Sequence, residues 1–425
     1  MTTMLTARIL KLHALEVGFD LVGIAPPSAL KDLTFLPRWI ERGFGGDMHY
    51  LENPKREDPR RVLPSVKSII CAALIYNTPL PYSTEVLNPP FRSENGSAGR
   101  RAATINTRSR GWISRYAWGK DYHEVMRRML KRLRKAIETL APNAETRVFV
   151  DTGPIVERAF ARLTGIGWMG KNTCVINEQK GSWFFLGLIL TNLDLEVDFP
   201  APDRCGSCTR CLDACPTGAL VEPYVMDGSR CISYFNIELR GAIPAEFRTS
   251  IGQNIFGCDI CQDVCPWNRR PQPLANALQH DDLSDDLSQD VPLGARFHSQ
   301  ACAATTAVPE FHPLRVEADS ESPSLPGNPE SVPDAQRPGS PAFSLFHPPL
   351  EDLAAITEED FPRIFAHSPI KRAKYRGWLR TLCVVMGNSG DGRFIPWLKA
   401  AADSPDPMVR EHAHWALKKL QQEIR

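Results

Sequence analysis

The chain has 425 residues, of which 43% are hydrophobic and 23% charged, and its formal net charge is +1. This length and composition can bury a large core and form two or three domains, which excludes a largely disordered protein. The longest apolar runs, such as Trp183 to Leu190, are far too short to span a bilayer, and the charged Arg8, Lys11 and Glu16 argue against an export signal. We therefore expect a cytoplasmic protein with no membrane segment.

The charge is unevenly distributed along the chain. Between Pro271 and Leu350, eleven acidic residues against three arginines leave a charge of −8, so the rest of the chain carries +9. Twelve Lys and Arg residues fall within Arg100–Lys135, and five fall within Lys371–Arg380. Two such clusters suit a polyanion such as a nucleic acid, and solvated helix faces are the alternative that charge alone leaves open.

Residues 1–197 alternate between helical and strand-like patterns, which predicts an α/β or α+β domain. We expect helices at Leu5–Val17 and Tyr122–Leu140, and strands at Leu21–Ile24, Ser68–Tyr76 and Arg147–Val150. The segment Pro79–Arg110 is rich in Pro, Gly, Ser and Asn. It is expected to be a long loop, either a lid or a disordered stretch.

Two polar residues near these elements have competing interpretations. The run "DYHEVM", Asp121–Met126, is similar to the D-x-H-x-x-G pattern of proteins that give cobalamin a His ligand, but Met126 replaces the Gly and a helix is expected there. His123 is therefore interpreted as a helix-surface residue. Asp151 follows a predicted strand, where it could be an acid in an active site or the N-cap of a helix that begins near Ile155.

The stretch "GIGWMGKNT", residues 165–173, has the G-x-x-x-x-G-K spacing of a phosphate-binding loop. That loop, like the dinucleotide-binding G-x-G-x-x-G, needs a strand before it and a helix after it. Here the preceding Ile155–Leu163 is helical in pattern, and the following Thr173–Ile176 is strand-like. Asn172 also stands where a phosphate loop has Ser or Thr. A nucleotide site is therefore not expected.

The cysteines carry the strongest signal. Cys205, Cys208, Cys211 and Cys215 form the run C-x₂-C-x₂-C-x₃-C-P, which is typical of ferredoxins with [4Fe–4S] clusters. In such proteins the fourth cysteine binds the other cluster, so a second set of ligands must exist. Paired structural zinc sites are the alternative, but zinc favours separate C-x₂-C knuckles.

The second cysteine run is incomplete. "CDICQDVCPWN" supplies Cys258, Cys261 and Cys265 but has Ile255 at the expected first position, so Cys231 is the candidate for the missing ligand. This predicts two groups of four ligands within residues 198–270: Cys205, Cys208, Cys211 and Cys265 for one cluster, and Cys215, Cys231, Cys258 and Cys261 for the other.

The last third of the chain divides into two parts. Residues 271–349 are rich in Pro, Ser and acidic residues and are expected to be a linker or a disordered insertion. Residues 350–425 return to helical patterns, with helices expected at about 351–366, 369–386, 394–402 and 407–424. Two helix pairs of this size are typical of a short HEAT-like solenoid.

Several motifs together resemble the epoxyqueuosine reductases of bacterial tRNA modification. They are both cysteine runs, "RCISYFNIE", "KREDPRRVLPSVKSII", "SRYAWGKDYH", "RVFVDTGPIVERAFARLTGIGWMGKNTCVIN", "GSWFFLGLILT", "RAKYRGWLRTLCVVMGNSGD" and "VREHAHWAL". The resemblance leaves out only about residues 79–110 and 271–349. This chain departs from the family's usual residues at Gly153, Asn236 and Thr381.

The resemblance implies a fold, cofactors and a reaction. It implies an α+β, nitroreductase-like domain that binds cobalamin (residues 1–197), a ferredoxin-like module with two [4Fe–4S] clusters (198–270) and a HEAT-like tail that helps to hold the tRNA anticodon arm (350–425). The implied reaction removes the epoxide oxygen from epoxyqueuosine at the wobble position of tRNA, giving queuosine and water. An external low-potential electron donor would feed the clusters, and we expect a monomer.

The resemblance also assigns roles to particular residues. It makes Asp151 the proton donor to the leaving oxygen, and burial beside an apolar cofactor face would keep this carboxyl protonated near neutral pH. The implied cobalamin contacts are Arg56, Tyr116, Asp151, Trp168, Lys171, Asn172 and Ser233. The implied tRNA contacts are Lys371, Arg372, Lys374, Arg376 and Arg380. The alternatives are a corrinoid enzyme of the reductive-dehalogenase type and a non-catalytic electron-transfer protein.

Overall fold

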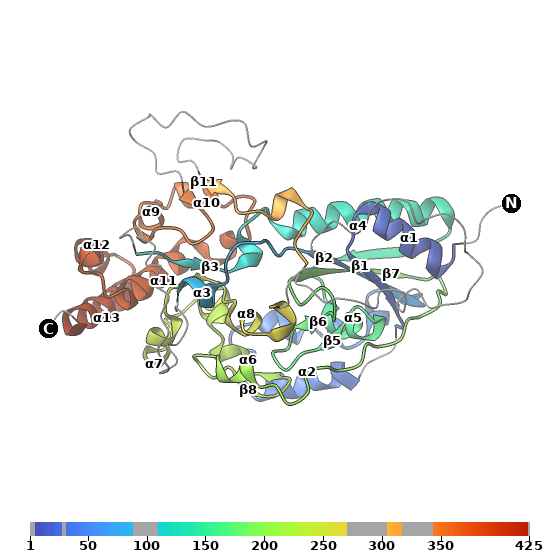
Figure 1. The fold of residues 1–425 in the computed structure, drawn as a ribbon, viewed down its shortest axis with the longest axis horizontal. Helices are drawn as coiled ribbons and strands as arrows, with labels where there is room; N and C mark the ends of the chain where they lie inside the picture. Colours follow the sequence, from blue (N-terminus) through green and yellow to red (C-terminus); the bar gives the residue numbers. More distant parts are fainter. Residues whose placement is uncertain (1–4, 28–30, 88–108, 270–303, 317–342, 424–425) are drawn as a thin grey trace, which may run out of the picture.

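The computed structural model describes residues 5–27, 31–87, 109–269, 304–316 and 343–423 (Figure 1). Its centre is a four-stranded sheet in the order β1-β2-β7-β4, in which every neighbouring pair is antiparallel. The strands are β1 (Leu21–Ala25), β2 (Ser68–Ile75), β7 (Phe184–Thr191) and β4 (Thr146–Phe149). The predicted α+β class is confirmed.

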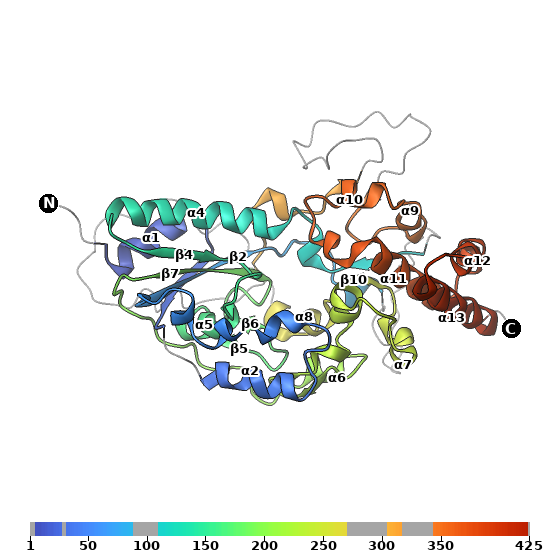
Figure 2. The same ribbon diagram turned by 180° about the vertical axis from the view of Figure 1, so that it is seen from behind.

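Helices cover both faces of this sheet, which explains why β2 is apolar along its whole length. Ile70, Ala72 and Leu74 pack under helices α1 (Ala7–Val17) and α4 (Tyr122–Leu140). The alternate residues Ile69, Cys71 and Ala73 pack on the other face with the short helix α5 (Glu157–Ala161). Figure 2 shows α1 and α4 together on one side of the sheet and α5 on the other. This alternation follows from the two-residue period of a strand.

The cysteine-rich segment joins the first domain through backbone pairing. Strand β3 (Trp112–Ile113) pairs in parallel with β10 (Asn254–Phe256), although the two lie far apart in sequence. Asp259 accepts hydrogen bonds from Trp112 Nε1 at 2.9 Å and Arg115 N at 2.8 Å. The other elements of this segment are α6 (Arg210–Asp213), β8 (Leu220–Glu222), β9 (Val225–Met226), α7 (Ala245–Arg248) and α8 (Ile260–Asp263).

The remaining short elements surround this frame. Helix α2 (Lys31–Glu41) and three turns of 3-10 helix connect β1 to β2, and the hairpin β5–β6 follows α5. Its strands are Trp168–Met169 and Val175–Ile176. Helix α3 (Ser83–Val86) lies within the predicted loop 79–110, of which residues 88–108 lie outside the described part of the chain.

Part of the predicted linker 271–349 belongs to the core. Residues 304–316 and 343–349 are described, and they contain the pair β11 (Arg315–Val316) and β12 (Phe343–Ser344). Val316, Phe343 and Leu345 are buried in a core shared with the cysteine-rich segment and the tail. The linker prediction was therefore wrong for these residues, because composition averaged over 79 positions hides two short apolar strands. Residues 271–303 and 317–342 lie outside the described part.

The C-terminal tail is helical, but two predicted helices are interrupted. In place of one helix over 351–366 there are α9 (Leu350–Ala354) and α10 (Asp360–Ile364). The break is at Thr357, whose hydroxyl accepts from Asp360 N at 3.2 Å. A 3-10 helix, Pro369–Ala373, precedes α11 (Lys374–Asn388). Lys374, the first residue of α11, has φ +60°. Helix α13 (Pro407–Glu423) then packs against α11, and α12 (Ile395–Ala402) packs against α13.

Arg380 on α11 fastens the tail to the cysteine-rich segment. It is 1% exposed, and its guanidinium donates to the carbonyls of Leu239 at 2.8 Å and Gly241 at 2.7 Å and to that of Phe235. The sequence predicted this residue as a tRNA contact. That role is wrong for Arg380, because a side chain enclosed in the core cannot meet a phosphate.

We predict that Arg380→Met destabilises the chain, since it removes the buried guanidinium that donates to three carbonyls, of which that of Phe235 is buried. Removing one partner from a buried charged network typically costs about 3–5 kcal/mol. Arg376→Met on the same helix is the matched control, because Arg376 forms an exposed pair with Asp406, and such pairs contribute about 0–1 kcal/mol. Urea unfolding of both variants checks this, and equal losses of stability would contradict the assignment.

Candidate functional site

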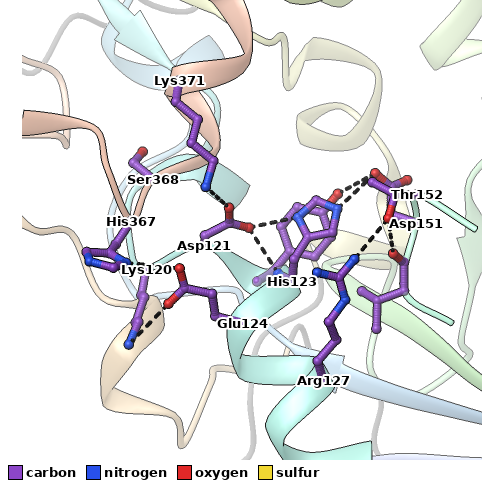
Figure 3. A network of polar contacts seen from close by, with 12 residues as sticks. Lys120, Asp121, His123, Glu124, Arg127, Asp151, Thr152, His367, Ser368 and Lys371 are labelled. Carbon is purple, nitrogen blue, oxygen red and sulfur yellow. Dashed lines mark hydrogen bonds and ion pairs between the residues drawn. The ribbon is translucent and has the colours of Figure 1, made fainter. Parts of the chain in front are cut away.

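Asp151 lies directly after β4, in a backbone conformation that few residues adopt. Its φ is +55°, in the left-handed region that Asp tolerates better than most side chains. Its Oδ2 accepts from Tyr122 Oη at 2.9 Å and lies 3.3 Å from His123 Nε2 (Figure 3). The alternative role as a helix cap is excluded, because α5 begins at Glu157 with Val156 as its N-cap residue.

The charge state of Asp151 differs from the prediction. Burial tends to raise the pKa of this carboxyl, but the close imidazolium of His123 and the hydrogen bond from Tyr122 outweigh it, and the net pKa lies below its usual value. The side chain is also 62% exposed. The prediction that burial keeps Asp151 protonated near neutral pH was therefore wrong for this resting arrangement.

His123 is the functional residue that sequence reasoning missed. It was interpreted as a helix-surface residue, but its side chain is only 20% exposed and its ring stacks on Tyr122 with centroids 4.2 Å apart. Its Nδ1 lies 2.7 Å from Asp121 Oδ1. Burial tends to lower the pKa of His123, but the two carboxylates Asp121 and Asp151 raise it to about 9. The D-x-H spacing at the helix start was the available signal, since an N-cap Asp accepts from the backbone N–H two residues on and so lies beside that residue's side chain.

Further charged groups lie near Asp151, beyond Tyr122 and His123. Arg372 of the tail forms a two-point contact with Glu238, at 3.0 Å from Nε and 2.7 Å from Nη2. Its guanidinium lies 5.7 Å from the ring centre of Tyr50, and that of Arg56 lies 5.9 Å from the same ring. Burial together with the charge of Glu238 raises the pKa of Tyr50 to about 12. The tail thus contributes a cation to the surroundings of Asp151.

Glu157, also near Asp151, has an uncharged carboxyl. Burial, and then the nearby charge of Asp151, raise its pKa to about 8, so it is protonated at neutral pH. Its Oε1 is buried and has no hydrogen-bond partner among the described residues. A neutral carboxyl with an unused oxygen can accept a hydrogen bond from an amide or a hydroxyl of a bound group.

The eight cysteines of the module form two groups. In the first, Cys211 and Cys265 each lie close to Cys205, and these three thiols line one cavity together with Cys208. In the second, Cys231 lies close to Cys215, Cys258 close to both, and Cys261 close to Cys231 and Cys258. We call them the first thiol group (Cys205, Cys208, Cys211, Cys265) and the second thiol group (Cys215, Cys231, Cys258, Cys261).

The "GIGWMGKNT" hairpin packs against the cysteine module. Helix precedes it and strand β6 follows it, as predicted, so it lacks the frame of a phosphate loop. Lys171 Nζ donates to the carbonyls of Gly206 at 2.6 Å and Cys208 at 3.0 Å. Asn172 donates to the Cys261 carbonyl at 3.2 Å. These contacts support both thiol groups from outside.

Three predicted cobalamin contacts therefore have other neighbours. Trp168 lies with its ring 4.9 Å from that of Trp267 and packs against Cys265. Lys171 and Asn172 donate their side-chain hydrogen bonds to backbone carbonyls of the cysteine module. Trp168, Lys171 and Asn172 therefore lie beside the first thiol group and not around Asp151. These contacts could not be predicted from the sequence, because a glycine-rich loop does not reveal which neighbour it packs on. The role of the three residues as cofactor contacts stays a prediction.

Tyr116 and Ser233 lie between the second thiol group and Asp151. Ser233 hydrogen-bonds the Cys231 thiol. Tyr116 lies against Gly257, which precedes Cys258, and its ring is 6.2 Å from that of Tyr122. Because Tyr122 bonds Asp151, the path from the second thiol group to the carboxylate passes through this tyrosine pair.

The basic residues of the tail differ in their surroundings. Lys371 pairs with Asp121 at 2.8 Å, Arg372 with Glu238, and Arg376 with Asp406. Lys374 is exposed, and no partner is found for it among the described residues. In the described part of the chain, no helix is both long enough and apolar enough to cross a bilayer.

Comparison with known proteins finds relatives for both the cysteine module and the sheet domain. Residues 204–268 match the family described as a 4Fe-4S double cluster binding domain, and residues 56–152 match the family described as epoxyqueuosine reductase QueG, DUF1730. The chain is 34% identical over 409 residues to an epoxyqueuosine reductase of Pseudomonas aeruginosa, covering 95% of this chain and 91% of that protein. A Synechocystis epoxyqueuosine reductase is 41% identical over 64% of this chain and 87% of its own.

A solved structure is similar over nearly the whole chain. It is an epoxyqueuosine reductase crystallised with an epoxyqueuosine-modified stem loop of tRNA-Tyr, with a TM-score of 0.70, 29% identity, and coverage of 97% of this chain and 89% of that one. The fold and the paired thiol groups define an iron–sulfur oxidoreductase with a double-cluster domain. The chain belongs to the epoxyqueuosine reductase family.

Proposed function

We propose that this chain reduces epoxyqueuosine to queuosine in the anticodon of tRNA. The observation that carries the proposal is the position of Asp151, held by Tyr122 and His123 and linked through the ring of Tyr116 to the segment of the second thiol group, in a chain of this family. Reduction of the epoxide consumes two electrons and two protons and releases an alkene and water. Family membership favours this function over the predicted alternatives of a dehalogenase or an electron carrier.

The two thiol groups are proposed as the ligands of two [4Fe–4S] clusters. Cys205, Cys208, Cys211 and Cys265 would hold one cluster, and Cys215, Cys231, Cys258 and Cys261 the other. The nearness of Cys231 to Cys215 and Cys258 supports its role as the remote ligand. An external low-potential donor would then reduce the first cluster, and electrons would pass through the second towards Asp151.

Cobalamin is proposed to lie between the second thiol group and Asp151. The residues present there fit such a group: Tyr116 and Ser233 line the side towards the thiols, and Arg56 lies on the side of Tyr50. The unpartnered Oε1 of the neutral Glu157 offers a hydrogen-bond acceptor of the kind that corrin amides require. When bound, cobalamin supplies the low-potential redox chemistry that opens the epoxide.

The chain itself supplies the proton chemistry. Asp151 would deliver a proton to the departing epoxide oxygen, because its carboxyl lies at the mouth of the site and is well exposed. Tyr122 and His123 fix its orientation, and such positioning contributes to rate because a misplaced acid cannot reach the leaving oxygen in the transition state.

The tRNA is proposed to contact the tail next to this site. A family relative has been crystallised with a modified tRNA stem loop, which supports tRNA as the partner. Lys374 is the first candidate contact because it is exposed and has no partner in the described part of the chain, and Arg376, Lys371 and Arg372 are exposed beside it. The face of α4 that carries Arg127 to Lys135 is the second candidate surface.

Several finer descriptions belong to the same proposal. We propose a nitroreductase-like domain over residues 1–197, a ferredoxin-like module over 198–270 and a HEAT-like tail over 350–425. The antiparallel pairing of the central sheet and the packing of α11, α12 and α13 support the first and the last. A cytoplasmic location follows from the tRNA substrate, and the monomeric state stays a prediction.

The cluster assignment predicts a selective loss of iron. After anaerobic reconstitution the chain should bind about eight irons, and Cys231→Ala should lose about half of them, because one of two cubanes loses a ligand. Cys383→Ala is the control, since this thiol is buried in the tail core. Full iron content in Cys231→Ala would contradict its role as the remote ligand.

The proposed acid predicts a loss of chemistry without a loss of binding. Asp151→Asn should lower the single-turnover rate of pre-reduced, cobalamin-loaded enzyme on epoxyqueuosine-tRNA by about 10² to 10⁴-fold, because an amide cannot donate the proton that general acid catalysis requires. Iron content and tRNA affinity should stay at the wild-type level. The exposed Asp194→Asn serves as the control, and undiminished turnover in Asp151→Asn would remove this residue from the mechanism.

The proposed RNA surface predicts a change in salt dependence. Lys374→Glu should weaken binding of the tRNA stem loop and reduce the slope of log K against log salt by about 0.7–0.9, the value of one lost phosphate contact. Its backbone strain at φ +60° is the same for Lys and Glu, so the fold is not the variable. Lys399→Glu on α12 is the control. An unchanged slope in Lys374→Glu would favour the α4 surface.

A further inference from the structure

A line of four charged groups leads from the C-terminal tail to Asp151 (Figure 3). Lys371 Nζ lies 2.8 Å from Asp121 Oδ2, and Asp121 Oδ1 lies 2.7 Å from His123 Nδ1. His123 Nε2 in turn lies 3.3 Å from Asp151 Oδ2. The four residues come from three separate parts of the chain: the 3-10 helix Pro369–Ala373, the start of α4 and the segment after β4.

Asp121 is held so firmly that it fixes the imidazole. Its side chain is 5% exposed, and both carboxylate oxygens are in use, Oδ2 on Lys371 and Oδ1 on the ring and backbone N–H of His123. Its own N–H donates to the His367 carbonyl at 2.6 Å. Because a carboxylate can only accept, Nδ1 of His123 carries a hydrogen, and the ring presents Nε2 to Asp151.

The hydrogen on Nε2 is not committed to another group. Nε2 is buried and makes no aligned hydrogen bond with a described residue, and its contact with Asp151 at 3.3 Å is one of charge. A short movement of the Asp151 carboxylate, or the arrival of a substrate oxygen, would complete the hydrogen bond. A buried donor without a hydrogen-bond partner lowers the stability of the fold. Such a donor therefore calls for an explanation, and a use during function is one.

The proton count of the reaction gives this donor a role. Removing the epoxide oxygen as water takes two protons, and Asp151 has one acidic position, which is ionised at rest. Building on the proposed reduction of epoxyqueuosine, we propose that His123 is the second acid of the site and passes its Nε2 proton to Asp151 or to the leaving oxygen. Asp121 and Lys371 are positioning residues that hold the imidazole in its doubly protonated form.

In this step the N–H bond of His123 breaks and an O–H bond forms on Asp151 or on the substrate oxygen. Neutral imidazole remains, and water later returns its proton. The electrons come from the clusters through the proposed cofactor, so the protein side chains change only their protonation. One proton comes from His123, directly or through Asp151, and solvent water supplies the second, so both protons of the released water are accounted for.

The charged groups around His123 favour its protonated form. Asp121 and Asp151 contact the ring, and the pKa of His123 is raised to about 9 although burial opposes this. The other titratable or charged groups of the surrounding elements lie one contact further away: Tyr122, Glu124, Lys120 and Arg127 on or beside α4, His367, Lys371 and Arg372 in the tail, and Glu157 after Asp151.

Two substitutions should shift the titration of His123 in opposite directions. Asp121→Asn removes an adjacent negative charge and should lower the pKa of His123 by about 1–3 units, while Asn preserves the cap of α4. Lys371→Met removes the cation that offsets Asp121 and should raise the pKa. A role in folding alone predicts no such opposition. Nuclear magnetic resonance of labelled histidines in the full, cluster-loaded chain measures this without any substrate, with His123→Gln identifying the signal.

The rate of the reaction should follow the same shifts. Single-turnover reduction of epoxyqueuosine-tRNA by the wild type should fall as the pH rises through about 9, because His123 then loses its proton. This alkaline limb should move to lower pH in Asp121→Asn and to higher pH in Lys371→Met. His123→Gln should lose the limb and slow the reaction by about 10² to 10⁴-fold.

His367→Gln is the matched control, since this tail histidine pairs with Glu124 at 2.9 Å beside the line of four groups but is not part of it. It should leave both the titration of His123 and the rate unchanged. Shifts in the same direction for Asp121→Asn and Lys371→Met, or full activity in His123→Gln, would overturn the proposal while wild-type turnover upheld the proposed function. A wild type that leaves epoxyqueuosine intact would contradict the proposed function itself.

Discussion

The buried carboxylate of Asp259 is the contact on which the arrangement of the molecule depends. It is fully enclosed next to Cys258, and it binds the indole of Trp112 and the backbone N–H of Arg115. The guanidinium of Arg115 then donates to the carbonyls of Thr78, Leu80 and Pro81 at 2.9–3.0 Å. One ionic cluster therefore joins the second thiol group to the sheet domain. Since an unpaired buried charge costs several kcal/mol, this contact strongly favours a single relative placement of the two.

The sequence predicted elements best where local chemistry decides the structure. Helix α4 has the predicted bounds, because Asp121 caps its first turn and its apolar residues recur at helical spacing. The grouping of the cysteines could be predicted because ligand spacing is fixed by the geometry of a cubane. His123, Arg380 and Lys171 could not be assigned in this way. Each owes its role to a segment distant in sequence, and periodicity carries no information about which segment packs there.

The three departures from the family's usual residues have structural explanations. Asn236 is buried and binds Gly257 through both its donor and its acceptor, a pairing that a Thr could not make in full. A Cβ on Gly153 would lie 2.3 Å from the Phe149 ring, so an Ala there requires that ring to move. Thr381 is buried, and its hydroxyl donates a hydrogen bond to the Gly377 carbonyl at 3.0 Å. None of the three is Tyr122 or His123, the residues that contact Asp151.

The tail contributes charged groups to the surroundings of Asp151. Lys371 and Arg372 each neutralise a carboxylate beside Asp151, namely Asp121 and Glu238, while Arg376 is paired within the tail itself. Two adjacent residues of one short 3-10 helix thereby set the electrostatics around the acid. Their neighbour Lys374 is held in a strained backbone conformation that only the surrounding packing can maintain. A chain cut before residue 369 would keep the sheet, the cysteines and Asp151, yet leave Asp121 and Glu238 without their cations, so the site depends on the tail even before any RNA is bound.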